Sequence, residues 1–285
     1  MVVMVGLCTL VHRQTFKSTV DQVVVPVTIH TELAAHAASL QAEDFRVFDD
    51  GRPVPILTFG RIRQSVDVLL LLDTSRSMAE SLSQVRSAAH AVTARLERGD
   101  SVQVGTFSSI LRMSPPFSVD DKELASHLPF VPGANMTILY DALVEGCSAF
   151  GREDNRRAIF VVSDGLDTAS SASVGTVMQR AAEASVSIYA VGLSSRHVER
   201  GKTIVRAPDS TLRGIAETTG GTYVDAGASR DYSQLFGEMI EELRQQFLLG
   251  FTPAQADGRI HSLLVTTRRP NITVRARKQY LAPVR

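Results

Sequence analysis

An aspartate followed by two serines stands at the end of an apolar stretch, and these three residues could bind a cation. The stretch is VDVLLLLDTSRSMAE, residues 66–80, in which Asp73 ends the apolar run and Ser75 and Ser77 follow at alternate positions. A carboxylate and two hydroxyls are hard oxygen donors, which suit Mg²⁺. A structural interpretation stands beside this one, because Ser77 and Glu80 match a helix capping box and an acidic residue near a helix N-terminus is favourable without a metal.

A strand and a helix must position this loop. The apolar run Val68–Leu72 shows no alternation, which is typical of a parallel strand covered on both faces. From Met78 to Leu96 the apolar residues recur at steps of three and four, which predicts one face of a helix of about five turns. Asp73 then lies at the carboxyl end of a strand, where open α/β sheets bind their ligands.

Two distant segments carry similar chemistry. In GANMTILYDAL, residues 133–143, a threonine precedes an apolar helix, and in IFVVSDG, residues 159–165, another buried strand runs into an aspartate. With these three loops the chain resembles the von Willebrand factor type A (VWA) domain with its metal-ion-dependent adhesion site. The resemblance implies a bound Mg²⁺, or alternatively Mn²⁺ or Ca²⁺. It implies as ligands Asp73, Ser75, Ser77, Thr137 and Asp164.

The charges of these ligands suggest what the metal would bind. Asp73 and Asp164 neutralise a divalent cation and the hydroxyl ligands are neutral, so the metal stays attractive to one more anionic oxygen. In the family that the chain resembles, an Asp or Glu of a partner protein fills this position. Asn135, Met136 and Asp167 are candidates for the rim of the site. For Asn135 and Met136 an interpretation as ordinary loop residues stands equally beside this one, and for Asp167 a solvated loop is the favoured interpretation.

The fold class follows from the alternation of strand and helix patterns between residues 65 and 246. This alternation predicts an α/β fold with a doubly wound, mostly parallel sheet flanked by helices, as in VWA and Rossmann-like domains. The expected strands after the first are 102–107, 110–113, 158–163, 186–193 and 222–224. The expected helices are 120–128, 139–150, 174–184, 210–218 and a last one from Tyr232 to about Gln245.

Segments on either side of this region are rich in strand patterns. In Val20–Thr31 the residue Pro26 indicates an edge strand or a bulge, and further strands are expected at 45–48, 54–59, 247–251, 262–267 and 272–276. Neither end has enough apolar residues for a core of its own. We therefore expect residues 15–64 and 247–285 to form one small β module around a VWA domain at 65–246. This layout resembles the VWA-related proteins of acidobacteria, which have counterparts of DFRVFDDG and of QFLLGFTP to VRARKQY.

The first residues, 1–14, contain the apolar run MVVMVGLCTLV. It is similar to the apolar region of a secretory signal but is too short to span a bilayer, and it lacks a positive start and a small-residue cleavage site. We expect a truncated or misassigned start of a secreted, periplasmic or cell-surface protein. A lipid anchor on Cys8 is not expected, because Leu7 stands where a small residue is needed.

Composition excludes several function classes. The 285 residues include 30 Lys+Arg and 30 Asp+Glu, so a strongly basic face for nucleic acid is not expected. The chain has two cysteines, Cys8 and Cys147, which predicts no disulfide framework; Cys147 fits a buried free thiol. Signatures of dinucleotide, hydrolase and zinc-protease sites are missing from the sequence. Gly201-Lys202-Thr203 lacks the earlier glycine of a phosphate-binding loop, since Arg196 stands there, so a surface loop is expected.

These patterns favour a metal-dependent protein-binding module for adhesion or assembly, and not an enzyme. One alternative is a phosphoryl-transfer enzyme of the haloacid dehalogenase type, which also begins with a strand that ends in an aspartate. Ser75 replaces the second aspartate of its D-x-D-x-T motif, which argues against this alternative. Another alternative is a purely structural VWA scaffold in an envelope complex.

Overall fold

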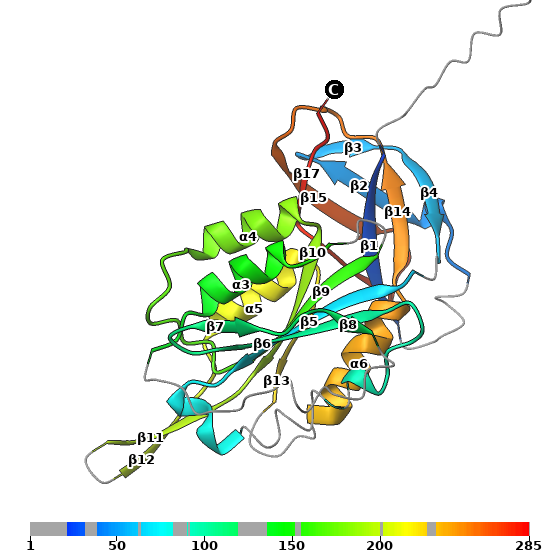
Figure 1. Ribbon diagram of the computed structural model, residues 1–285. Helices are drawn as coiled ribbons and strands as arrows, with labels where there is room; N and C mark the ends of the chain where they lie inside the picture. The colour runs from blue at the N-terminus through cyan, green and yellow to red at the C-terminus, as the bar shows by residue number, and fades with distance from the viewer. Residues whose placement is uncertain are drawn as a thin grey trace, which may run out of the picture.

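The computed structural model shows a central sheet with helices on both faces and, beside it, a module of antiparallel strands (Figure 1). The structure describes residues 22–31, 39–61, 64–81, 90, 92–118, 136–151, 155–199, 202–226 and 232–284. The apolar start with Cys8, the expected helix 120–128 and Asn135 lie outside the described residues.

The central sheet has the parallel, doubly wound arrangement that the sequence predicts. Its strands are β5 (Val66–Asp73), β6 (Ser101–Phe107), β7 (Leu111–Met113), β8 (Phe117–Ser118), β9 (Arg156–Ser163), β10 (Val186–Gly192) and β13 (Tyr223–Asp225). The order is β13-β10-β9-β5-β6-β7, with β7 and β8 antiparallel to β6. Every residue of β5 is buried, as the unbroken apolar run requires of a strand between two neighbours and two helical layers.

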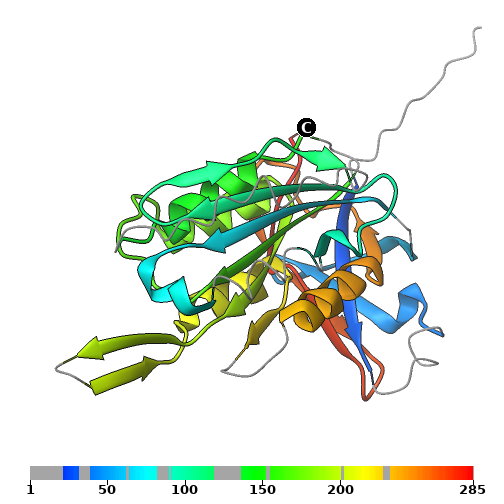
Figure 2. The same cartoon turned by 60° about the horizontal axis from the view of Figure 1, so that its bottom comes forward.

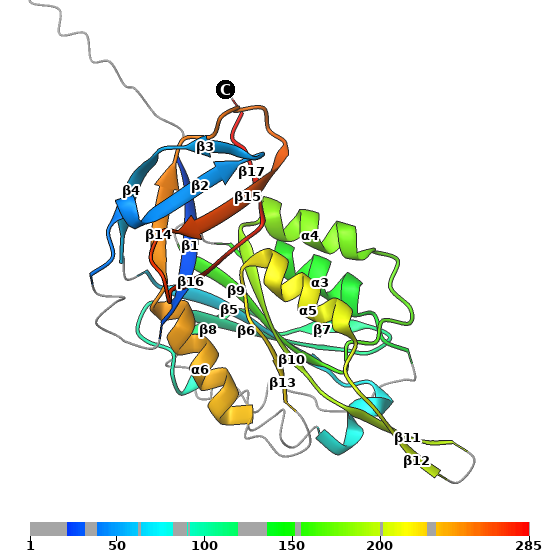
Figure 3. The ribbon, with the colours of Figure 1, turned by 180° about the vertical axis from the view of Figure 1, so that it is seen from behind.

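Helices cover the two faces of this sheet (Figures 1 and 3). The helices are α3 (Leu139–Ser148), α4 (Val174–Glu183), α5 (Ser210–Thr219), α6 (Tyr232–Arg244) and the short η2 (Arg76–Ser81). Alternate residues of β5 point to opposite layers, so Leu69 packs in the cluster of α3 to α5 and Leu70 in that of α6. Cys147 is buried with a free thiol, as expected, and burial raises its pKa to about 12.

The expected helix from Met78 to Leu96 is described only in part, because residues 82–89 and 91 lie outside the described residues. It begins as the 3₁₀ helix η2. Met78, Val92 and Leu96 are all buried in the cluster of α6, which agrees with the apolar face that their spacing predicts.

The two ends of the chain pair in one β module, as predicted. One sheet has the order β16-β1-β14-β4, formed by β1 (Val23–His30), β4 (Ile56–Gly60), β14 (Phe247–Phe251) and β16 (Thr273–Ala276). The other has the order β17-β15-β2-β3, formed by β2 (Phe45–Asp49), β3 (Arg52–Val54), β15 (Ile260–Thr267) and β17 (Gln279–Leu281), with η1 (Ala42–Asp44) before β2. Val27 and Leu249 of the first sheet share a core with Val47 and Val265 of the second.

Three details differ from the sequence-based expectation. The expected strand 54–59 is two strands in different sheets, because the chain turns at Pro55 between β3 and β4. Strand β1 is interior and not an edge. It tolerates Pro26 because its pairing with β16 begins only at Val27, so the missing N–H breaks no bond on that side. Residues 202 and 203, expected in a surface loop, belong to a hairpin of β11 (Ser195–Glu199) and β12 (Lys202–Arg206), which projects from the body (Figure 2).

The β module contacts the end of the sheet at which β9 and β10 begin. The amide of Lys278 donates to the carbonyl of Thr218 at 2.8 Å, and Gln246 Nε2 donates to Thr28 Oγ1 at 3.0 Å. The loops that carry Asp73 and Asp164 lie at the opposite, carboxyl end of the strands (Figure 3). A search of the described helices finds none that is long and apolar enough to cross a membrane.

Candidate metal site at the carboxyl end of the sheet

The first candidate ligand, Asp73, is the last residue of β5 and is fully buried, with 0% of its surface exposed. Its Oδ1 accepts a hydrogen bond from the amide of Ser75 at 2.8 Å, and its Oδ2 accepts one from Ser163 Oγ at 2.6 Å. Burial raises the pKa of Asp73 to about 6; the hydrogen bonds from Ser163 and Ser75 oppose this, and the negative charge of Asp164 adds to it. No positively charged group of the described residues contributes to this pKa.

Asp164 follows β9, the neighbour of β5, so strand register brings the two aspartates to the same edge. Asp164 is 1% exposed, and its Oδ1 accepts from the amide of Leu166 at 3.1 Å. Its Oδ2 is buried and has no hydrogen-bond partner among the described residues. A buried carboxylate oxygen without a partner is costly, and a cation would satisfy it.

The hydroxyl candidates belong to the same edge of the sheet. Ser75 is buried and Ser77 is exposed, and their Oγ atoms lie 3.1 Å apart. Thr137 is 4% exposed and is tied to the loop after β9, because its amide donates to Thr168 Oγ1 at 2.8 Å and its carbonyl accepts from the amide of Thr168 at 2.9 Å. The end of β6 links the loops that carry Ser75 and Thr137. The amide of Thr74 donates to the carbonyl of Phe107 at 2.8 Å, and the amide of Ile138 donates to the carbonyl of Ser108 at 2.9 Å.

The proposed rim residues differ in their surroundings. Met136 is 52% exposed, as a residue that contacts a partner would be. Asp167 is engaged within the chain: its Oδ1 accepts from the amide of Tyr140 at 3.2 Å and from Ser170 Oγ at 2.5 Å. It thereby supplies a cap to the start of α3, for which Ile138 offers no side-chain oxygen. A role of either residue at the rim stays a prediction.

Ser163 is a residue that sequence reasoning missed. Its hydroxyl donates to Asp73 Oδ2 and accepts from the amide of Gly165 at 3.0 Å, so it links the loops that carry Asp73 and Asp164. Gly165 has a φ of +81° and packs against Asp209, where a side chain would clash. In the sequence, Ser163, Asp164 and Gly165 indicate a turn after a strand. Nothing in that pattern predicts the hydrogen bond from Ser163 to Asp73, which is ninety residues away.

A second group of acidic residues lies in the β module and also has the composition of a cation site. Asp49, Asp50 and His261 have ligand atoms within 4.8 Å of one another. However, His261 Nδ1 lies 2.8 Å from Asp49 Oδ1, and its Nε2 lies 3.0 Å from Asp257 Oδ1. The second oxygen of Asp49 accepts from the amide of Ala254 at 2.7 Å. Both ring nitrogens and both oxygens of Asp49 are thus satisfied, so this cluster needs no metal.

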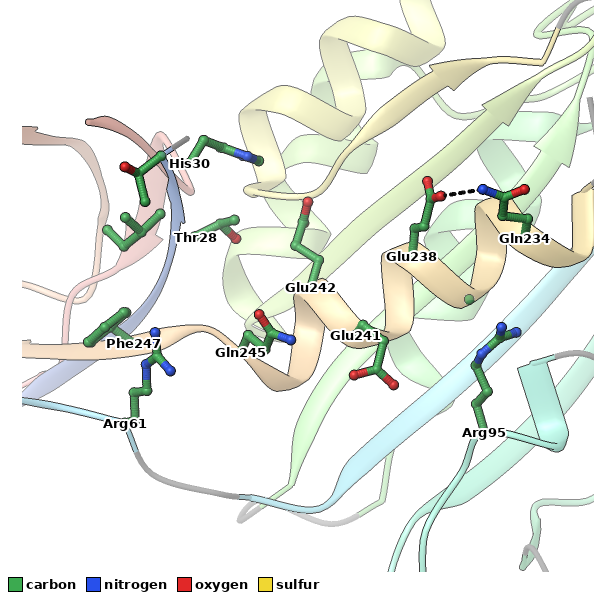
Figure 4. A pocket seen from close by; sticks show the side chains of 13 residues that line it. Thr28, His30, Arg61, Arg95, Gln234, Glu238, Glu241, Glu242, Gln245 and Phe247 are labelled. Atoms are coloured by element: carbon green, nitrogen blue, oxygen red, sulfur yellow. Dashed lines mark hydrogen bonds between the residues drawn. The ribbon is translucent and has the colours of Figure 1, made fainter. Parts of the chain in front are cut away.

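The cavity in Figure 4 lies away from the loops that carry Asp73 and Asp164, between α6 and the β module. It has a volume of about 730 Å³, and its lining carries charges of both signs. Glu238 in this lining accepts a hydrogen bond from Gln234 at 2.9 Å, and Arg61 stacks on the ring of Phe247 at 4.6 Å. Because glutamates and arginines both line the cavity, its charges do not favour one class of ligand.

Comparison with known proteins agrees with this geometry. The von Willebrand factor type A domain family matches residues 67–236. No curated protein matches the chain. Among solved structures, an aerotolerance-related membrane protein from Bacteroides fragilis is 18% identical over 63% of this chain and 98% of its own, with a TM-score of 0.52.

Two further structures share the fold. A von Willebrand factor type A protein from Catenulispora acidiphila is 12% identical over 77% of this chain and 67% of its own, with a TM-score of 0.52. Proximal thread matrix protein 1 from the mussel byssus is 15% identical over 63% of this chain and 48% of its own, with a TM-score of 0.51. Because the family match spans more than half of its residues, the chain belongs to the von Willebrand factor type A domain family.

Proposed function

We propose that this protein is a metal-dependent protein-binding module that recognises an acidic group on a partner. The metal is Mg²⁺, and its ligands are Asp73, Ser75, Ser77, Thr137 and Asp164. The observation that carries the proposal is the buried Oδ2 of Asp164, which has no hydrogen-bond partner among the described residues. Membership of a family whose domains bind protein partners supports it.

The charges of the site support an acidic ligand. Asp73 and Asp164 together balance the two charges of the metal, and the three hydroxyl residues add none. A bound Mg²⁺ would act as a Lewis acid toward one further oxygen, and a carboxylate is the strongest such ligand that a protein partner offers. Mn²⁺ and Ca²⁺ also prefer oxygen ligands, so the binding experiment described below is repeated with each of them in place of Mg²⁺.

We further propose that the protein binds without turnover and acts outside the cytoplasm. Both oxygens of Asp73 accept hydrogen bonds, from Ser75 and from Ser163, so neither is presented as the free nucleophile that phosphoryl transfer by a haloacid dehalogenase requires. We expect no metal-dependent hydrolysis of phosphate esters above background. An activity lost in Asp73→Asn would favour the enzymatic alternative.

The binding proposal is tested by capture on the immobilised protein. Proteins of an extracellular fraction and peptides that contain Asp or Glu are applied with Mg²⁺ and with a chelator, and the same peptides with Asn or Gln serve as controls. We expect retention only of acidic ligands and only with metal, and its loss in Asp73→Ala. Glu145→Ala is the matched variant, because it removes an exposed carboxylate of α3 far from the loops. Equal retention of amide and acid peptides would contradict the proposal.

A further inference from the structure

We propose that a second site binds a small oxyanion, a carboxylate or a phosphate, between the central sheet and the β module. The inference is independent of the proposed metal site, which lies at the other end of the strands. A cavity of about 360 Å³ is present there, and both parts of the molecule contribute to it. Its lining residues are Val24, Pro26, Gln64, Asn155, Arg156, Arg157, Ser185, Ser187, Leu243, Gln246, Leu248 and Arg277.

The charge of this lining is positive. It includes three arginines, and none of the described residues that line it is an aspartate or a glutamate. Serine hydroxyls and the amides of Asn155 and Gln64 add uncharged hydrogen-bonding groups. Guanidinium groups with hydroxyl and amide neighbours are the groups with which proteins bind carboxylates and phosphates.

Arg277 is a buried positive charge in this lining. It is 7% exposed, and within the described part of the chain its guanidinium forms one hydrogen bond, from Nη2 to the carbonyl of Ser185 at 3.1 Å, and no ion pair. Burial alone lowers its pKa to about 10. A buried guanidinium without a counter-charge is unfavourable, so an anion that reached it would be bound favourably.

The position of Arg277 is fixed by the contact between the two parts of the molecule. The next residue, Lys278, donates its amide to the carbonyl of Thr218 at the end of α5. Gly220, with a φ of +85°, lets the backbone of Arg277 approach; a Cβ on this glycine would lie 2.7 Å from the Arg277 nitrogen. The backbone of Arg277 is therefore held against α5, beside the cavity that its side chain lines.

The other two arginines are held at the same place by main-chain carbonyls. Arg157 Nη1 donates to Ala184 at 2.9 Å, and Ala184 precedes the Ser185 carbonyl that binds Arg277. Arg156 Nη1 donates to Leu243 at 2.5 Å, at the end of α6. An oxyanion in the cavity would add charge-assisted hydrogen bonds from these guanidinium groups to the carbonyl contacts that they already make. Because the lining comes from both parts, a bound oxyanion would strengthen their contact.

The test measures thermal unfolding of the whole chain while sodium phosphate or sodium acetate replaces sodium chloride at equal ionic strength. At about a hundred times Kd we expect Tm to rise by about 5 °C or more. A rise with one oxyanion and not the other would identify the group that the site prefers. No rise with either would overturn the proposal.

Arg277→Met separates a binding site from a structural contact. We expect this variant to lose the rise in Tm with phosphate or acetate, to be no less stable than wild type in low-anion buffer, and to keep its Mg²⁺ affinity. Arg112→Met, which removes an exposed arginine of β7, should keep the rise. An unchanged rise in Arg277→Met would overturn the proposal. A second outcome would also overturn it. Residues 153 and 154 lie outside the described residues, and if Tm rose with oxyanion only in the double variant Glu153→Gln, Asp154→Asn, the chain's own carboxylates would be the occupants of the site.

Discussion

Two clusters in this molecule contain buried aspartates and differ in how the carboxylates are satisfied. At the end of the central sheet, Asp73 and Asp164 receive hydrogen bonds only from neutral groups, and Asp164 Oδ2 has no partner among the described residues. In the β module, Asp49 shares its charge with His261, and every oxygen of Asp49 accepts a hydrogen bond. Among the described residues, no cationic side chain hydrogen-bonds either aspartate of the first cluster, whereas the imidazole of His261 hydrogen-bonds Asp49 in the second.

Burial of acidic residues therefore does not by itself indicate a binding site. The Asp49 cluster closes a contact between β2 and β15, and its atoms are as close as metal ligands would be. Its histidine hydrogen-bonds both Asp49 and Asp257, so the buried carboxylate of Asp49 has a partner within the chain. Asp164 Oδ2 has no such partner among the described residues, and this is the basis for our proposal that a cation from solution binds there. The two clusters should therefore respond in opposite ways to loss of an acid.

Asp49→Ala should have the largest effect of the substitutions considered below. It removes the buried partner of His261 and leaves an amide of Ala254 without its acceptor. Breaking a buried ion pair in this way typically costs about 3–5 kcal/mol. Urea unfolding of the variant should show this loss in free energy of unfolding. A loss below about 1 kcal/mol would mean that the cluster is not the closed ion pair described above.

Asp164→Asn should change stability in the opposite direction in metal-free protein. The substitution removes a negative charge whose buried oxygen has no partner, so the free energy of unfolding should rise by roughly 1–3 kcal/mol. The measurement is urea unfolding in the presence of a chelator. Added Mg²⁺ should stabilise wild type and leave this variant unchanged. Destabilisation similar to that of Asp49→Ala would remove the contrast between the clusters.

Ser163→Ala tests how the metal site is supported. The hydroxyl orients Asp73 without being one of the proposed ligands, and loss of such outer contacts typically weakens metal affinity by about 10–100-fold. Calorimetric titration with Mg²⁺ measures the effect, and Ser148→Ala on the exposed side of α3 is the control. An affinity equal to that of wild type would show that Ser163 does not position Asp73.

The smallest expected effect is the pH dependence of the stability that His261 contributes in the β module, about 1 kcal/mol. Burial disfavours protonation of His261, but its hydrogen bonds to Asp49 and Asp257 outweigh this and raise its pKa above 6.5. The stabilisation is fully present below the unfolded pKa of about 6.5 and is lost as pH rises through the higher folded pKa. The stability difference between wild type and His261→Gln should therefore shrink from about pH 6 upward. A difference that grows with pH would reverse this assignment.

The sequence predicted those features that depend on neighbouring residues. The run Val68–Leu72 indicated a buried parallel strand, and D-x-S-x-S at its end indicated a ligand loop. Individual side-chain contacts that depend on the exact strand register were not predictable. The bond from Ser163 to Asp73 and the pair of Asp49 with His261, which are 212 residues apart, exist only because particular strands are neighbours. The hairpin β11–β12 was missed because its polar sequence resembles a loop.

The central claim is that the two aspartates at the end of the sheet hold Mg²⁺ together. Calorimetric titration of metal-free wild type, Asp73→Ala and Glu145→Ala with Mg²⁺ tests it most directly, with unfolding curves to verify that each protein is folded. We expect one site in wild type and in Glu145→Ala, and no measurable binding to a folded Asp73→Ala. Wild-type affinity in Asp73→Ala would contradict the account.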